Sequence, residues 1–375
     1  MRVLIASKLN MRESYGGSNR AFYLGRHLAE KVTVFHVGPD CSRIDYAAGT
    51  RSTGSLGVGA FVREIRRAIR DFNPDVVYAF ESRANLACRL LRLGNARRRL
   101  VVDFNSSPAF EWRTYLRGSE INPAHCALRY AMSRVIEKTI LSAAPCVVVA
   151  SAFLRDLVID WYRVNPDRVS VVPNGAPPEM FERAPSPGPS PFAALGDGTA
   201  SALLIAPRQF YSNVEAVRFA HRAAERLERL DPGVRLVVLG GGPAVGTSPN
   251  VRYLGYVPDV VPFIDFADVC LLPYPNSAVC GGARLKSMEY LARGKPVLTT
   301  PEGIRGIDGI RDGVEVVIAP DNPNDFAHAL SALIRDRSRH AALGLAAREF
   351  VALRHDWRLL ARQLLDILGG AYDRS

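Results

Sequence analysis

Short apolar runs alternate with longer amphipathic segments along most of this chain of 375 residues. The first half begins with a strand-like run at Arg2–Ala6, a helix-like segment at Ser18–Lys31 and a second run at Val32–Val37. The second half starts again with a run at Ser201–Ala206 and a helix-like segment at Asn213–Leu230. Alternation of this kind predicts an α/β protein with parallel sheets that are covered by helices on both faces.

A stretch rich in proline and glycine interrupts this alternation near the middle of the chain. Val172-Pro173-Asn174-Gly175 predicts a turn, and Pro178–Gly198 has the composition of a linker. We therefore expect two doubly wound, Rossmann-like domains that face each other across a cleft, formed by residues 1–176 and 177–355. A C-terminal helix within residues 356–375 is expected to pack back toward the first domain.

Positive charge is concentrated in the first half of the chain. Residues 1–180 contain 26 Lys and Arg against 16 Asp and Glu, whereas residues 181–375 contain 22 against 21. Such an excess attracts a polyanion, although a solvated surface is the plain alternative. Nucleic acid is not expected, because no helix-turn-helix, zinc-finger or RNP-like motif accompanies the charge. The remaining candidate partner is an anionic membrane surface, which the protein would contact through arginines and through exposed aromatic side chains at Phe110, Trp112 and Tyr115.

Other global features favour a globular cytoplasmic protein. Its first residues lack the pattern of a signal peptide, and the longest apolar run, near Ala143–Ala152, is too short to cross a bilayer. Six cysteines show no C-x-x-C spacing, so neither structural zinc nor a disulfide framework is expected. We expect a cytoplasmic location, with peripheral attachment at the inner face of the membrane.

Residues 281–289 carry the most specific chemical pattern, between two strand-like runs. Gly281 and Gly282 let backbone N–H groups approach a ligand, and the positive end of the following helix points to the same place. Arg284 and Lys286 add full charges there, and Glu289 lies about one and a half turns beyond Arg284. A phosphate site followed by a carboxylate that reads hydroxyls suits a nucleotide diphosphate sugar. An ordinary helix N-terminus is the alternative.

A second glycine pair follows the first strand-like run. Gly16 and Gly17 precede a helix, so their N–H groups could bind a phosphate or the transferred sugar. The alternative is a loop in which Ser18 caps the helix. This is not the dinucleotide fingerprint, because the G-x-G-x-x-G spacing is missing.

Together these motifs resemble family 4 glycosyltransferases of the GT-B fold. The run from Gly282 to Glu289, followed by Gly294-Lys295-Pro296-Val297, is similar to the family's nucleotide-binding helix and the strand after it. Many members carry two glutamates eight positions apart, but here Gly281 stands in the first position, as in a sub-group of the family.

The resemblance implies roles for further residues. Arg208 follows a strand where the family places a basic residue on the diphosphate, although a surface arginine is the alternative. Asp103 ends a strand near the expected acceptor, where it could orient a hydroxyl or accept its proton, or only cap the next loop. The implied catalytic residues are Asp103, Arg208 and Lys286. The implied donor-binding residues are Gly16, Gly17, Arg208, Gly241, Val257, Gly281, Gly282, Arg284, Leu285, Lys286 and Glu289.

The implied reaction transfers a sugar from a nucleotide diphosphate sugar to a hydroxyl acceptor, with retention of the anomeric configuration. The acceptor is expected to be carried by a lipid, and the nucleotide base cannot be read from side chains. No Asp-x-Asp pair stands near a strand end, so cationic side chains would replace a metal ion and no cofactor is expected. The alternatives are a non-catalytic subunit that binds a partner transferase and a nucleotide-sugar epimerase.

Overall fold

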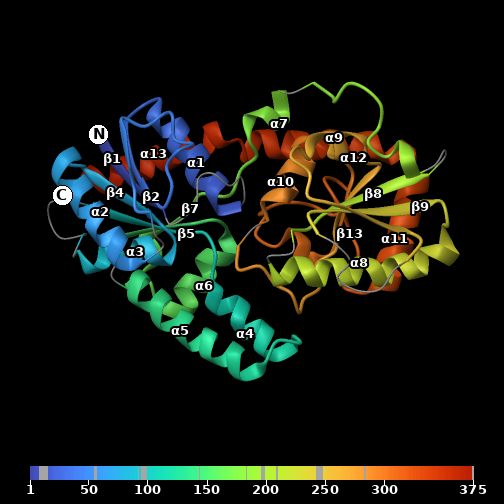
Figure 1. The fold of residues 1–375 in the computed structure, drawn as a ribbon, viewed down its shortest axis with the longest axis horizontal. Coiled ribbons are helices and arrows are strands. Elements are labelled where there is room, and N and C mark those ends of the chain that lie inside the picture. The colour runs from blue at the N-terminus through green and yellow to red at the C-terminus, as the bar shows by residue number, and fades with distance from the viewer. Residues whose placement is uncertain are drawn as a thin grey trace.

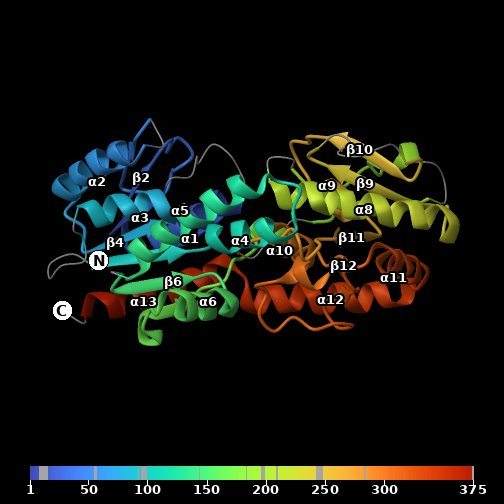
Figure 2. The ribbon, with the colours of Figure 1, turned by 90° about the horizontal axis from the view of Figure 1, so that it is seen from below.

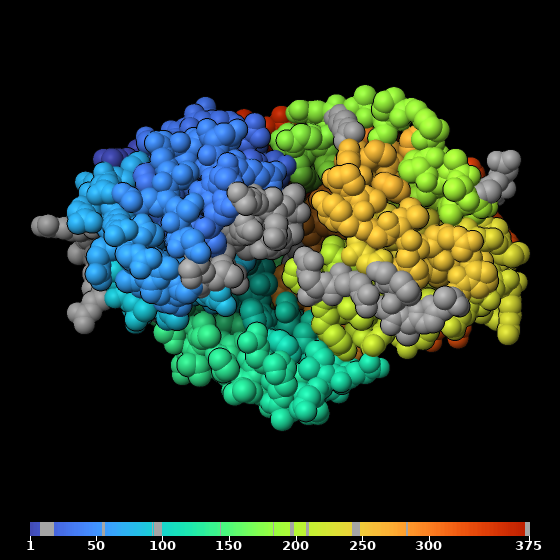
Figure 3. Space-filling view, in the orientation of Figure 1, coloured from blue at the N-terminus to red at the C-terminus, as the bar shows by residue number. Residues whose placement is uncertain are grey.

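The computed structural model describes residues 1–7, 16–54, 57–91, 93, 99–142, 144–182, 184–195, 199–207, 210–241, 248–282 and 284–373. Within them lie two parallel β-sheets, one in each half of the chain, and helices cover both faces of each sheet (Figure 1). The predicted fold class, two doubly wound α/β domains, is confirmed. The two domains lie side by side, and the helices α4 and α5 project from the first domain (Figure 3).

The first sheet has seven parallel strands in the order β3-β2-β1-β4-β5-β6-β7. The strands are β1 (Arg2–Ser7), β2 (Thr33–Gly38), β3 (Gly49–Ser52), β4 (Val76–Phe80), β5 (Arg99–Phe104), β6 (Cys146–Val149) and β7 (Val169–Val171). Strands β1 and β4 pair at the centre and are almost entirely buried, which explains their continuous apolar sequences. The order reverses between them, so ligands are expected beyond their carboxyl ends.

The helices around this sheet are α1 (Gly16–Ala29), α2 (Val58–Phe72), α3 (Glu81–Leu90), α4 (Pro108–Gly118), α5 (Pro123–Ser142) and α6 (Ala152–Tyr162). Helix α2 shows why they form: Phe61, Ile65 and Phe72 recur at helical spacing and are buried, and the helix ends where Asn73 takes a left-handed conformation. Its arginines lie on the opposite, exposed face.

The second sheet has six parallel strands in the order β10-β9-β8-β11-β12-β13. They are β8 (Ala200–Ile205), β9 (Val234–Leu239), β10 (Val251–Gly255), β11 (Val269–Leu272), β12 (Val297–Thr299) and β13 (Val317–Ile318). The accompanying helices are α7 (Pro178–Glu182), α8 (Tyr211–Leu230), α9 (Val261–Phe266), α10 (Leu285–Ala292), α11 (Pro323–Arg335) and α12 (Arg337–Arg354). Helix α10 therefore connects β11 to β12, which are neighbours in the sheet.

The last helix, α13 (Trp357–Asp373), returns to the first domain (Figure 2). It packs against α1, and Trp357, Leu360, Leu364 and Leu368 are buried in the same apolar cluster as β1 and β4. The chain thus passes between the domains twice, and the two passages are joined where the Ala176 N–H donates to the His355 carbonyl at 2.8 Å. The first domain is completed by residues from both ends of the chain.

Candidate functional site

A glycine loop (residues 278–282) follows β11 and lies against the first domain. The Ser107 N–H donates to the Gly281 carbonyl at 3.1 Å, and the Tyr115 hydroxyl donates to the Val279 carbonyl at 2.8 Å. In return, the Gly281 N–H donates to Oε1 of Glu111 at 2.7 Å. The glycine loop is therefore held at the boundary between the domains, beside the N-terminus of α4.

The close approach of two backbones explains both glycines. A Cβ atom on Gly282 would lie 2.1 Å from the Asn105 carbonyl oxygen, and one on Gly281 would lie 2.5 Å from the Ser107 carbonyl oxygen. No side chain fits at such distances, so a glutamate at position 281 would require the loop to move. Glu111 of the first domain places a carboxylate on the Gly281 N–H instead, and burial raises the pKa of this carboxyl to about 7.

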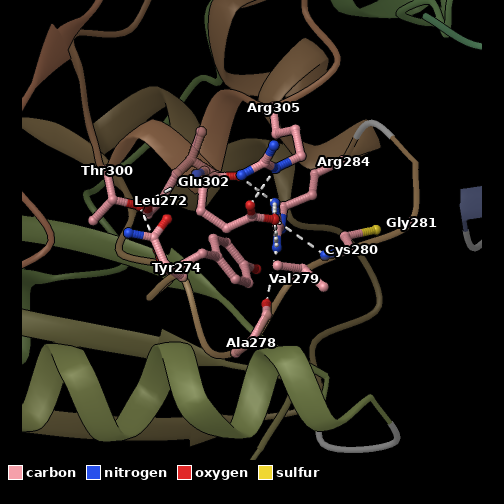
Figure 4. A network of polar contacts seen from close by, with 12 residues as sticks. Leu272, Tyr274, Ala278, Val279, Cys280, Gly281, Arg284, Thr300, Glu302 and Arg305 are labelled. Carbon is pink, nitrogen blue, oxygen red and sulfur yellow. Dashed lines mark hydrogen bonds and ion pairs between the residues drawn. The ribbon is translucent and has the colours of Figure 1, made fainter. Parts of the chain in front are cut away.

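Arg284 is buried beneath this loop, as Figure 4 shows. Its Nη1 donates to the carbonyl and to Oε1 of Glu302, at 2.5 and 3.2 Å, and its Nη2 donates to the Ala278 carbonyl at 3.3 Å. Its guanidinium also stacks 3.7 Å from the centre of the Tyr274 ring. The charge of Arg284 is thus paired within the second domain, where it fixes the glycine loop to the segment after β12.

Lys286 lies on the first turn of α10, at the carboxyl end of β8. Its Nζ donates to the Ile205 carbonyl at 2.6 Å, to the Tyr274 hydroxyl at 2.8 Å and to Oδ1 of Asn213 at 3.0 Å. All three partners are neutral, so the positive charge of Lys286 has no carboxylate partner among these bonds. A lysine held in this way is poised to attract an anion.

Glu289 is one turn further along α10 and half-buried. Burial raises its pKa to about 7, while the charge of Lys286 acts in the opposite direction. Burial raises the pKa of Tyr23 on helix α1 to about 12, and the negative charges of Glu179 and Glu289 act in the same direction. Leu285 packs against the apolar cluster of the first domain. The start of α10 therefore faces both domains.

The remaining predicted donor residues lie at loops and helix ends. Gly16 and Gly17 are the first residues of α1. Gly241 follows β9 and is buried, and Val257 follows β10 and packs, half-buried, against the core of the second domain. Arg208 lies outside the described residues.

Asp103, predicted to face the acceptor, is fully buried at the end of β5. Arg20 donates to it through Nε, at 3.2 Å to Oδ1 and 3.1 Å to Oδ2, and through Nη2 at 2.8 Å to Oδ2, where the Tyr78 hydroxyl also donates. Arg20 continues through Nη1 to the Pro173 carbonyl at 2.9 Å and to Oδ1 of Asn174 at 3.1 Å. This network links β5 and α1 to the turn between the domains.

Sequence reasoning assigned no role to Arg20. Its one signal is its position, four residues before the buried Leu24 on the apolar face of α1. An arginine on such a face needs a buried partner, because a buried charge is costly unless it is paired. That partner is 83 residues away along the chain and could not be identified from local spacing.

The expectation that Phe110, Trp112 and Tyr115 are exposed is wrong. Tyr115 is buried, and the other two pack half-buried in a small cluster with Cys126 and Val279. The described part of the chain contains no group of three or more His, Cys, Asp or Glu side chains that could hold a metal ion. Its helices also include none that is long and apolar enough to cross a membrane.

Two parallel sheets in separate domains, with a glycine loop held at the boundary between them and a lysine at the carboxyl end of β8, are the architecture of the GT-B class of glycosyltransferases. A model described as "Glycosyltransferase Family 4" matches residues 15–180, and one described as "Glycosyl transferases group 1" matches residues 201–336. The chain belongs to the family 4 glycosyltransferases.

Similar proteins are found both in sequence and in structure. A D-inositol 3-phosphate glycosyltransferase from Stackebrandtia nassauensis is 28% identical over 64% of this chain, which spans 58% of the length of that relative. Sucrose-phosphate synthase from Thermosynechococcus elongatus aligns over the full length of both chains with a TM-score of 0.79 and 17% identity. HepE from Anabaena, in complex with UDP and glucose, aligns over 98% of this chain and 99% of its own with a TM-score of 0.73 and 16% identity. These structures share the fold.

Proposed function

We propose that the protein transfers a sugar from a nucleotide diphosphate sugar to a hydroxyl group, with retention of the anomeric configuration. The observation that carries this proposal is Lys286 on the first turn of α10, whose ammonium group donates to three neutral oxygens among the described residues. The name of the Stackebrandtia relative supports glycosyl transfer, and the UDP and glucose bound to HepE support a nucleotide-sugar donor.

In this proposal, Lys286 exchanges one neutral partner for an oxygen of the donor diphosphate. The exchange is favourable because a hydrogen bond between charged groups is roughly twice as strong as one between neutral groups. The start of α10 and the first residues of α1 add backbone N–H groups that face the same charge. Arg208 is assigned to the diphosphate as well, and the backbone of Gly241 and Val257 to the nucleotide.

Arg284 and Asp103 take positioning roles in this proposal. Arg284 holds the glycine loop in place through Glu302, while the Gly281 N–H stays bound to Glu111. Asp103 holds Arg20, and both of its oxygens already accept hydrogen bonds. With no separate base needed, the leaving diphosphate would take the proton of the acceptor during attack from the same face, and the protein would orient the substrates and stabilise charge.

A thermal stability screen tests the donor. We expect one of UDP, GDP and ADP, or its sugar conjugate, to stabilise the protein selectively, and HepE makes UDP the first probe. A ligand that binds only the folded state at about 100 times its Kd adds about 2.7 kcal/mol. Transfer from the selected donor, with the anomer assigned by NMR, then tests retention. An absence of any shift would contradict the proposal and favour a non-catalytic subunit.

We also infer that the acceptor is carried by an anionic lipid membrane, which the first domain contacts through α5. Leu128, Met132 and Val135 recur at helical spacing on the exposed side of α5, with exposed fractions of 60%, 49% and 66%. Arg129 and Lys138 are also exposed on this helix. An apolar stripe flanked by cations suits the boundary between anionic headgroups and acyl chains.

Vesicle sedimentation tests this surface. The unmodified protein is expected to sediment with vesicles that contain phosphatidylserine, and less so at high salt. Changing Leu128, Met132 and Val135 together to Asp should abolish sedimentation, whereas Leu345→Asp, a change at a 71% exposed leucine of α12, should not. The membrane assignment fails if the triple variant still sediments, or if it changes only the oligomeric state measured by light scattering.

A further inference from the structure

A separate pocket of about 120 Å³ lies in the first domain, at the carboxyl ends of β4 and β5. Its wall is formed by the start of α3, the segment between β5 and α4, and the inner face of α5. Polar groups line much of this wall, including Ser82, Asn105, Ser106 and Ser133. The carboxyl ends of parallel strands are where doubly wound sheets bind their ligands.

The pocket adjoins the glycine loop of the second domain. Asn105 and Ser106 line the pocket, and the same two residues contact Gly282: a Cβ atom placed there would lie 2.1 Å from the Asn105 carbonyl oxygen and 3.4 Å from the Ser106 Cβ. A molecule in the pocket would therefore lie close to the glycine loop, with Asn105 and Ser106 between them. This is the place for a second substrate, so the inference below rests on the proposed function.

Glu81 gives the pocket a constrained carboxylate. It is the first residue after β4 and has φ +60°, in the left-handed region that a residue with a side chain rarely adopts. Such strain persists where the surrounding structure fixes it, and it clusters at binding sites. The Asn85 side chain supports the turn by donating to the Glu81 carbonyl at 2.8 Å.

Among the described residues, the lining contains acidic side chains and no lysine, arginine or histidine. The acidic groups are Glu81, Asp103, which is paired with Arg20, and Glu137, whose pKa is raised by burial. Arg20 lies behind the lining, where it neutralises Asp103, and Arg134 stacks 5.0 Å from the Trp161 ring. A phosphate group in this pocket would be desolvated without a cationic partner from the lining.

Hydroxyl groups match the same lining. Glu137 already accepts hydrogen bonds from the Ala109 N–H, the Ser107 hydroxyl and the Tyr162 hydroxyl, at 2.7, 2.8 and 2.7 Å. Glu81 adds acceptors, and the serine hydroxyls and the Asn105 amide can both donate and accept. We propose that this pocket holds the acceptor and selects an uncharged polyhydroxylated group over its phosphorylated counterpart. This preference is opposite to the one that the name of the inositol 3-phosphate relative indicates for that protein.

Ligand-observed NMR tests the selectivity without any donor. Saturation transfer to myo-inositol should exceed that to myo-inositol 3-phosphate, and Glu81→Lys should reverse the order. The ratio of the two dissociation constants should change by about tenfold or more, because the new lysine can form a hydrogen bond with the charged phosphate. Ser133→Lys places a cation on the opposite wall of the pocket. It replaces Glu81→Lys in the test if the strained turn at residue 81 does not tolerate that change. Glu225→Lys, at an exposed site on α8, is the matched control and should leave the ratio unchanged.

The outcomes separate this inference from the proposed function. Tighter binding of the phosphorylated compound by the unmodified protein overturns the inference, as does a ratio that neither lysine variant changes. If the protein binds neither compound, the inference is also overturned for the inositol headgroup, even if the nucleotide screen finds a donor. If the nucleotide screen fails but the protein binds the polyol selectively, the pocket stands as a binding site and the proposed transferase function fails.

Discussion

Replacing Lys286 with alanine is expected to lower kcat/KM for sugar transfer by about 10²- to 10³-fold, the typical effect of removing one group that stabilises developing charge. The ammonium group lies at the carboxyl end of β8 with three neutral partners, so its charge remains available to a diphosphate. Initial rates with the donor found by the nucleotide screen provide the measurement. Nucleotide affinity should fall with the rate, because the diphosphate is present in both the ground state and the product.

A second lysine offers a matched control for this change. Lys295 also donates its Nζ to a backbone carbonyl, that of Asp265 at 2.9 Å, but it follows α10 rather than beginning it. Lys295→Ala should leave nucleotide affinity near that of the unmodified protein. If Lys286→Ala retains full activity while its melting temperature is unchanged, the ammonium group does not bind the diphosphate.

Disrupting the pair between Arg20 and Asp103 is expected to have the largest effect on stability. Asp103→Asn leaves the Arg20 guanidinium buried without a carboxylate, and breaking a buried pair by removing one partner costs about 3–5 kcal/mol. The change should appear as a lower midpoint of urea unfolding. Asp156→Asn removes an exposed carboxylate that pairs with Arg155 at 3.0 Å, and it should cost less than about 1 kcal/mol.

A double variant separates the contribution of the ion pair to stability from the contribution of packing at the same site. Arg20→Met combined with Asp103→Leu removes both charges and should recover much of the lost stability, since apolar replacements of buried pairs are often neutral. If the single change to asparagine costs as little as the exposed control, the network through Tyr78 and the turn between the domains does not depend on charge.

The sequence predicted the elements whose signals are local. Apolar runs identified the central strands, because parallel strands buried on both faces need continuous apolar sequence. The edge strand β3 was missed, since its sequence Gly-Thr-Arg-Ser lacks that signal. Helix α4 was also missed. It begins at Pro108 after the capping residue Ser107, a start signal that was available.

The site was predictable only where its residues follow one another in the chain. Gly281, Gly282, Lys286 and Glu289 lie together because one loop and one helix carry them. The surroundings of Arg284 could not be read in the same way. Its buried partner Glu302 comes after the next strand, so spacing alone indicated an arginine facing a phosphate rather than one bound inside the domain.

The return of α13 has a consequence for biosynthesis. Trp357, Leu360, Leu364 and Leu368 belong to the apolar cluster that covers β1 and β4. A ribosome makes these residues only after all strands of the second sheet have been synthesised. The first domain is therefore completed only after the second sheet has been made, and a fragment that stops after residue 176 would expose the surface that α13 covers.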